Sequence, residues 1–338
     1  MRVSTTLAAA KEDVDTRIRG HDGVLGLRRW PLPRRHARVT SYLLVQALNG
    51  LVIGVIYALI AAGLTVIFSI LKIVNFAHGE IYMMGGYFGY FVITLLDIPP
   101  LPAVLVAMAL AFALSVLLER ALLSPLYDPR TERKSDYGIL VTFGISILLR
   151  NLAIIVFGPF PLRPPSFWPG TLVVGDLIMS WDRVFAAGAG IVILVVLLVF
   201  LARSAWGQAL NAVSQSRESA AIVGINDRLA YTLAFALGGG LAGGAGALVG
   251  PIYALSPSMG LIPDTQAFAI VVLGGMGSVG GAIIAALLLG VSESLFVALF
   301  PDPTRGLSYA QAFSLVVLMA VLLIRPTGFF GRAHTAME

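Results

Sequence analysis

Polar residues that could carry a proton or bind a solute interrupt one of the most apolar stretches of the chain. The segment NFAHGEIYMMGGY at 75–87 contains Asn75, His78 and Glu80, followed by Tyr82. Ionisable side chains inside a membrane are costly and usually functional, so these four residues are candidates for a substrate pathway. A competing hypothesis is that they only hold a helix break together by hydrogen bonds, with Asn75 capping the helix that begins near residue 78. One histidine and one glutamate do not supply the ligand set of a metal site.

A second interruption, LGGMGSVGGA at 273–282, consists largely of glycine. It lacks the Lys-Ser/Thr pair of a phosphate-binding loop, and that motif occurs nowhere in the chain, so ATP binding by this route is not expected. Glycine permits tight turns and close backbone approach, which predicts a second helix break. The further candidates for the pathway are Gly274, Gly275, Gly277 and Ser278.

The composition indicates that the surrounding elements are membrane helices. Of the 338 residues, 58% are hydrophobic and 12% charged, with a mean hydropathy of +0.89, whereas soluble domains are about half apolar and about a quarter charged. We therefore predict an all-α polytopic membrane protein. Arg150 and Glu293 fall inside long apolar segments, where each could pair within the bundle, extend towards the interface or meet substrate. The chain has no cysteine, which excludes disulfides and thiolate chemistry.

About 20 apolar residues are needed to cross a bilayer, and eight segments meet this length. Two further apolar pieces, 64–74 and 264–274, are too short to cross. The 228–249 segment contains GGGLAGGAG, whose small residues at four-residue spacing allow close helix packing. The predicted spans are 42–61, 79–96, 101–123, 137–158, 183–202, 228–249, 281–300 and 308–325.

Basic residues predict the orientation of the spans. Residues 1–38 hold nine Lys or Arg against four acids, and we interpret 1–40 as a cytoplasmic tail that either contacts anionic membrane lipid or is simply solvated. The loops 124–136 and 203–228 and the C-terminus also look cytoplasmic, and the cation-poor loops 159–182 and 250–263 look external.

These assignments agree with the number of spans only if both short pieces are re-entrant. Segment 64–74 would enter from outside and break at NFAHG, and 264–274 would break at GGMGSVGG, each followed by a helix that returns outward. Two quartets of this kind would flank a central pair of helices, an arrangement typical of transporters with broken helices at a midplane site. The alternative is that, for one loop, the number of basic residues does not indicate the correct side of the membrane.

The segment WGQALNAVSQSRESAAIVGINDRLAY at 206–231 has a short amphipathic pattern that ends at Gly224. Its periodicity fits either a loop that only connects two spans or a helix on which an energy-supplying cytoplasmic subunit docks.

Several long blocks, in the same order, resemble the LivH-type permease subunits of ATP-binding cassette importers for branched-chain amino acids, a family that also includes urea and amide permeases. The resemblance covers about residues 45–331. Its blocks are NGLVIGVIYALIAAGLTVIFSILKIVNFAHGEIYMMGGY (49–87), GILVTFGISILLRNLAIIVFGP (138–159), GQALNAVSQSRESAAIVGIN (207–226), AFAIVVLGGMGSVGGAIIAALLLGVSESL (267–295) and RPTGFFG (325–331).

The resemblance implies an ABC importer permease fold over 41–331, with tails at 1–40 and 332–338. It implies a transport subunit rather than an enzyme, in the plasma (inner) membrane of a bacterium or archaeon. Its partners would be a related permease subunit, an external solute-binding protein and two cytoplasmic ATPase subunits that bind ATP and magnesium; no cofactor in this chain and no nucleic acid are implied. It favours a coupling role for 203–227, where the implicated residues are Gly207, Ala212, Ala220, Ala221, Gly224 and Ile225.

The chain departs from the family pattern at positions that bear on the substrate. Gln266 stands where lysine is usual, Arg150 where an uncharged glutamine is common, Ser69 where glycine is common and Asn211 where arginine is common. The resemblance implies a branched-chain or other small hydrophobic amino acid as solute. The alternatives are urea or a short amide, and an ATP-independent channel or ion-coupled carrier in which Asn75, His78 and Glu80 relay protons.

Overall fold

The computed structural model describes residues 35–127, 131, 133–174 and 177–331. The chain divides into compact units at 1–41 and 42–338, and the second unit contains the helix bundle. The predicted all-α class is confirmed, with one small hairpin in addition. The long helices are α2 (Arg35–Leu71), α3 (His78–Leu96), α4 (Pro100–Leu118), α5 (Lys134–Phe157), α6 (Trp181–Arg203), α9 (Asp227–Val249), α11 (Val279–Leu299) and α12 (Pro303–Ile324); the shorter elements are η1 (Glu119–Leu123), η2 (Ser124–Tyr127), β1 (Thr171–Val174), β2 (Leu177–Ser180), α7 (Ala205–Gln215), α8 (Arg217–Ile222) and α10 (Leu261–Gly274).

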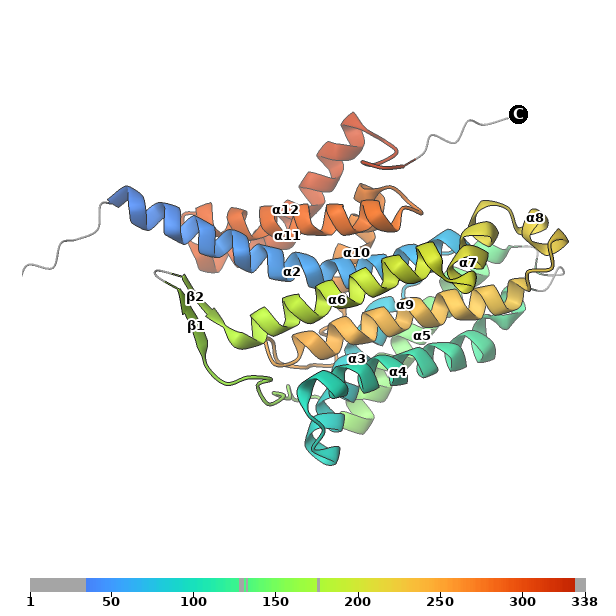
Figure 1. The fold of residues 1–338 in the computed structure, drawn as a ribbon, viewed down its shortest axis with the longest axis horizontal. Coiled ribbons are helices and arrows are strands. Elements are labelled where there is room, and N and C mark those ends of the chain that lie inside the picture. The colour runs from blue at the N-terminus through green and yellow to red at the C-terminus, as the bar shows by residue number, and fades with distance from the viewer. Residues whose placement is uncertain (1–34, 128–130, 132, 175–176, 332–338) are drawn as a thin grey trace, which may run out of the picture. The chain divides into compact units, whose positions relative to one another are not determined.

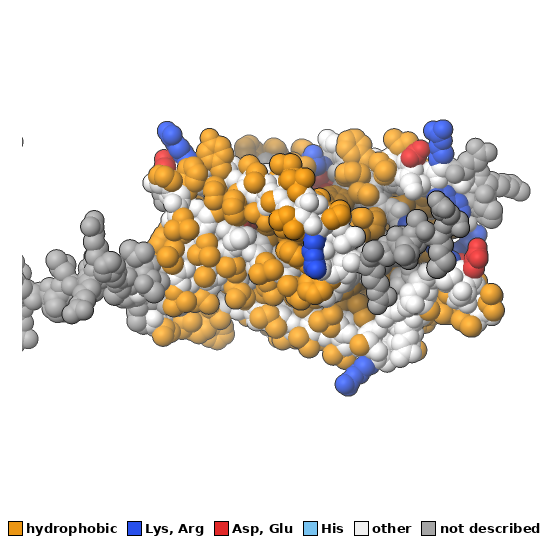
Figure 2. All heavy atoms as spheres, turned by 90° about the horizontal axis from the view of Figure 1, so that it is seen from above, with side chains coloured by type: hydrophobic (Ala, Val, Ile, Leu, Met, Phe, Trp, Pro, Cys, Tyr) orange, Lys and Arg blue, Asp and Glu red, His pale blue; other side chains and the backbone are white. Residues whose placement is uncertain are grey.

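Within the described residues, seven helical segments are long and apolar enough to cross a membrane. They correspond to seven of the eight predicted spans, and the eighth, α3, has sufficient length at 19 residues but is more polar. The 14-residue α10 is too short to cross, as the sequence predicts. Figure 2 shows hydrophobic side chains over most of one face with few charged ones, as expected for a surface in contact with lipid.

The first predicted re-entrant piece is wrong, because α2 is continuous through both 42–61 and 64–74 as far as Leu71. Gly63, which lies between these two predicted pieces, makes a packing contact, since a Cβ at Gly63 would lie 2.6 Å from the carbonyl oxygen of Gly238 on α9. Glycine here permits close helix approach without ending the helix. The predicted pair of matching quartets is therefore not formed.

The continuity of α2 determines which segments lie near each of its two ends. The α2 carbonyl of Ile70 accepts a hydrogen bond from Arg217 of α8 at 3.0 Å, so the Leu71 end of α2 lies with the 203–227 segment. Tyr42 lies about 45 Å away along a straight helix, which is longer than a bilayer core of about 30 Å. Tyr42 and the 203–227 segment therefore lie at opposite ends of α2, and the cytoplasmic side expected for residues 1–40 stays a prediction. The tail residues 1–34 lie outside the described residues.

The second predicted break is confirmed. Helix α10 ends at Gly274, and α11 begins at Val279 after Gly275 and Gly277, whose φ angles of +97° and +96° suit glycine. Ser278 caps α11 by accepting a hydrogen bond from the Gly281 N–H at 3.1 Å.

Small residues let α3, α4 and α9 pack closely in the core. A Cβ at Gly243 of α9 would collide with Ala111 of α4, and one at Gly246 with the Tyr82 carbonyl oxygen of α3. The glycine faces of α9 thus serve packing within this chain. Figure 1 shows α6 and α9 running alongside one another.

The two loops predicted to be external lie together. Leu162 and Leu255 exchange backbone hydrogen bonds of 2.9 and 2.8 Å. The antiparallel β1–β2 hairpin, in which Thr171 pairs with Ser180, lies within the first of these loops. In Figure 1 this hairpin and the α7–α8 segment lie at opposite ends of the bundle.

Candidate functional site

The chain between α2 and α3 forms a compact turn in the interior. Lys72 has a left-handed φ of 56° and ends α2. The Asn75 Oδ1 atom accepts a hydrogen bond from the Ala77 N–H at 3.1 Å. Asn75 thus stabilises the turn before the helix, and the expected capping role is wrong, since Ala77 occupies the cap position without a side-chain cap bond.

His78 joins α3 to α2. Its Nε2 lies 2.9 Å from the Ile60 carbonyl oxygen, to which it donates a hydrogen bond. Both His78 and Asn75 are completely buried. These two residues therefore hold the break in shape, whereas Glu80 has different surroundings.

Glu80 forms an ion pair with Arg150 of α5. The Arg150 Nε donates to Glu80 Oε1 at 3.1 Å, its Nη2 makes a second bond to the same oxygen, and the Ser146 hydroxyl donates to it at 3.3 Å. The Glu80 side chain is 3% exposed and that of Arg150 32%. Arg150 thus pairs within the bundle, which is one of the possibilities that the sequence left open, and its charge inside the membrane segment has an opposite charge as its partner.

A second acid approaches the start of α3 from α10. The Gly79 N–H donates to Asp264 Oδ1 at 3.0 Å, and Gly79 and Gly260 are in close backbone contact. Sequence reasoning missed Asp264, although its position as the single acid at the start of the short apolar piece 264–274 was a usable signal.

These charged groups line a cavity of about 510 Å³ between α3, α5, α10 and α12, a size within the usual range for small-molecule sites. One part of its wall carries the ion pair and Asp264, and another part is aromatic. The Phe76 ring lies 5.4 Å from that of Phe268 and 6.5 Å from that of Phe143, centroid to centroid. The lining residues are Phe76, Glu80, Phe143, Ser146, Ile147, Arg150, Gly260, Leu261, Asp264, Thr265, Phe268, Ala269, Val272, Leu315 and Leu318.

Of the eight predicted pathway residues, Glu80 alone lines this cavity. Asn75, His78 and Tyr82 are buried and do not line it, and the residues Gly274, Gly275, Gly277 and Ser278 form the second break. That break is held by the C-terminal segment, where the Phe329 N–H donates to the Leu273 carbonyl at 2.8 Å.

Two further positions singled out in the sequence lie off the cavity wall. Gln266 is buried on α10 but does not line the cavity. Glu293 of α11 accepts a hydrogen bond from Ser314 of α12 at 3.4 Å.

The 203–227 segment forms two short helices instead of one. The Ser204 and Ser216 hydroxyls cap α7 and α8 by accepting from Gly207 N–H at 2.9 Å and Ser219 N–H at 3.2 Å. Gly224 follows α8 with a φ of +85°, as its predicted terminating role requires. Ala212 and Ala220 line a groove of about 480 Å³ between the two helices, while Ala221 is exposed and Gly207 and Ile225 lie outside the groove lining; the groove residues are Gln208, Asn211, Ala212, Gln215, Ser216, Ser219, Ala220 and Val223.

Arg217 connects this segment to the end of α2. Its Nη2 donates to the carbonyl oxygens of Ile70 at 3.0 Å and Leu71 at 3.2 Å, and its guanidinium lies 5.0 Å from the centroid of the Tyr231 ring. Burial lowers the pKa of Lys72, and the adjacent charge of Arg217 lowers it further. A continuous path of contacts thus leads from α8 to the turn that positions Glu80.

Comparisons with known proteins agree with this architecture. A family model described as "Branched-chain amino acid transport system / permease component" matches residues 46–324. The high-affinity branched-chain amino acid transport system permease protein BraD of Pseudomonas aeruginosa is 34% identical over 299 residues, 86% of this chain and 96% of that protein. LivH of Escherichia coli, with the same description, is 32% identical over 307 residues, covering 86% and 96%. LivM of E. coli, again a branched-chain amino acid permease protein, is 28% identical over 309 residues, covering 81% and 67%.

Proposed function

Because the chain belongs to the family of permease components of branched-chain amino acid transport systems, we propose that it forms half of the translocation pathway of an ATP-driven importer for branched-chain or other small hydrophobic amino acids. The chain is a multi-pass membrane transport subunit and not an enzyme. The observation that carries the choice of solute is the cavity that places a carboxylate, a guanidinium and an aromatic wall together.

The cavity chemistry suits a zwitterion with an apolar side chain. In the empty state Glu80 and Arg150 neutralise one another, which lowers the cost of burying either charge. An arriving amino acid can exchange this pair for two new ones, its ammonium meeting Glu80 or Asp264 and its carboxylate meeting Arg150. Phe76, Phe143 and Phe268 then offer apolar surface to the side chain.

The cavity opens at the exposed surface of the helix bundle, where Phe143 and Leu261 are 55% and 47% exposed. A related permease subunit facing this surface would complete the pathway. E. coli LivH and LivM, two permease proteins from one organism that both resemble this chain, support such a pairing.

The remaining partners follow from the same proposal. The α7–α8 groove receives one of two ATPase subunits, which bind ATP and magnesium, and an external solute-binding protein delivers the solute at the hairpin end. The complex lies in the plasma (inner) membrane of a bacterium or archaeon with α7–α8 in the cytoplasm, where Arg203, Arg217 and Arg228 satisfy the positive-inside rule.

Uptake by the whole complex reconstituted in vesicles tests this function. Unlabelled leucine, isoleucine or valine should compete with labelled leucine for ATP-dependent uptake, and urea or acetamide at the same concentration should not. Competition by the amides but not by the amino acids would assign the alternative solute class. Flux that persists without ATP would contradict the importer assignment.

A further inference from the structure

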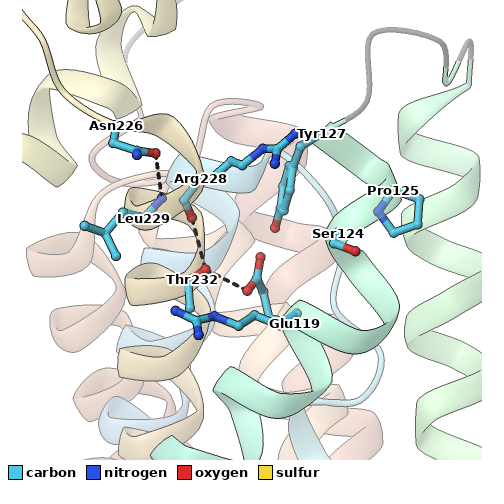
Figure 3. Close-up of a pocket in the computed structure, with 9 residues that line it drawn as sticks. Glu119, Ser124, Pro125, Tyr127, Asn226, Arg228, Leu229 and Thr232 are labelled. Atoms are coloured by element: carbon cyan, nitrogen blue, oxygen red, sulfur yellow. Dashed lines mark hydrogen bonds between the residues drawn. The ribbon is translucent and has the colours of Figure 1, made fainter.

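A second cavity, unrelated to the transported solute, lies where the end of α4 meets the start of α9. Its volume is about 570 Å³, and Figure 3 shows side chains from both elements around it. The lining residues are Glu119, Arg120, Ser124, Pro125, Tyr127, Asn226, Arg228, Leu229 and Thr232. It lies at the end of the bundle that carries α7 and α8, since Tyr127 and Arg228 also line a neighbouring cavity with Arg217.

The charges of this cavity leave cationic groups available for an anion. Glu119 is 1% exposed and accepts a hydrogen bond from the Thr232 hydroxyl at 2.7 Å, so the carboxylate is engaged within the protein (Figure 3). Arg120 and Arg228 are exposed, and neither guanidinium forms an ion pair within the described part of the chain. In Figure 3 the Arg228 side chain extends beside the Tyr127 ring, with the Ser124 hydroxyl on the opposite wall.

The approach to the cavity is apolar. On α4, Leu110 and Leu117 are 42% and 63% exposed and are seven residues apart, so they share one face of the helix. Arg120 follows Leu117 by three residues, at the start of the π-helical turn η1. A bilayer-embedded molecule that lies along this face of α4 therefore ends at Arg120, which lines the cavity together with Arg228.

We propose that this cavity binds the phosphate of an anionic phospholipid headgroup, held by Arg120 and Arg228, with the acyl chains along the exposed face of α4. Basic pockets between transmembrane helices at the membrane surface recognise such headgroups. A free phosphate would use the same cations but would gain nothing from Leu110 and Leu117. The proposal does not depend on the identity of the transported solute.

Lipid retention tests the site. The full chain, with whatever subunits accompany it from its host membrane, is purified in mild detergent from the wild type, from Arg120→Gln/Arg228→Gln and from the two single variants. Bound phosphatidylglycerol, cardiolipin and phosphatidylethanolamine are then quantified by mass spectrometry. The matched control is Arg133→Gln, which removes an exposed arginine at the same end that pairs only with Asp136 among the described residues.

We expect retained phosphatidylglycerol and cardiolipin to fall about five-fold for each arginine removed, with phosphatidylethanolamine and the control unchanged. Arg120→Lys/Arg228→Lys should retain most of the anionic lipid. Unchanged retention in both single variants would overturn the proposal, and these variants remain informative where the double variant fails to fold. Displacement of the lipid by millimolar inorganic phosphate would instead assign a small-anion site, and loss of an accompanying subunit without loss of lipid would assign a protein contact.

Discussion

At the scale of single residues, the Glu80–Arg150 pair can be separated into a structural and a solute-binding role. Glu80→Gln leaves the Arg150 charge without its partner, which should lower the free energy of unfolding by about 2 kcal/mol, less than the roughly 3–5 kcal/mol of a fully buried pair because Arg150 is partly exposed. Removing both charges in Glu80→Gln/Arg150→Gln should restore most of this stability, as thermal unfolding in detergent would measure.

Transport by the same variants gives the decisive comparison. If the pair exchanges with a zwitterion, the double variant is stable and yet transports leucine poorly, with a raised KM. Glu293→Gln is a suitable control, because Glu293 is also an acid in a membrane helix but its side chain does not line the cavity. Wild-type uptake by the stable double variant would show that the pair serves the fold alone.

The sequence predicted the candidate site only in part. Glu80 was identified because an acid in an apolar segment is conspicuous by its type. The ion pair between Glu80 and Arg150 was not predicted, because 70 residues separate the two and no local sequence pattern specifies which helices meet. Asn75 and His78 are equally conspicuous, but their hydrogen-bond partners are backbone groups, of Ala77 in the break and of Ile60 in α2. Residue type alone therefore did not distinguish them from a solute ligand.

At the scale of elements, Arg217 is the link between α8 and the break before α3. Arg217→Ala removes both hydrogen bonds to the end of α2, each worth about 1.5–3 kcal/mol when the donor is charged. We expect solute-stimulated ATPase activity of the complex to fall several-fold, because motion of α8 no longer reaches the turn that holds Glu80. Arg217→Lys should restore part of it.

Arg203→Ala is the matched control, since Arg203 is an exposed arginine at the end of α6 in the same region. Co-purification of the ATPase subunits should be the same for both variants. A loss of the subunits in Arg217→Ala would place the residue in docking, and full activity would exclude it from coupling.

The elements show where sequence patterns were sufficient and where they were not. The break at 274–279 was predictable because a run of glycines marks positions where the backbone can adopt a positive φ, as Gly275 and Gly277 do. The continuity of α2 was not, because a glycine that ends a helix and a glycine that packs against a neighbouring helix look the same in sequence. Only the contact of Gly63 with Gly238 distinguishes them.

At the scale of the whole molecule, the single crossing of α2 fixes which ends share a membrane side. Arg183, at the start of α6 beside the hairpin, donates to Asn49 of α2 at 2.6 Å, so the early part of α2 lies at the hairpin end. At the other end, Leu71 lines one cavity with Lys134 and Arg217. Tyr42 and the α7–α8 segment should therefore face opposite compartments, whatever the charge of the preceding tail suggests.

The absence of cysteine from the sequence makes this prediction testable without background labelling. Tyr42→Cys and Trp168→Cys, at positions 47% and 67% exposed, should react with a membrane-impermeant maleimide in spheroplasts. Arg133→Cys and Glu218→Cys, both exposed at the opposite end, should react only in inside-out vesicles or after permeabilisation. Because Arg133 lies outside the α7–α8 groove, it reports the side even where an ATPase subunit shields Glu218. Between positions 42 and 133 the chain crosses the membrane in α2, α3 and α4, which puts the two positions on opposite sides. Labelling of both positions from the same side would require an even number of crossings between them and would contradict the continuous helix α2.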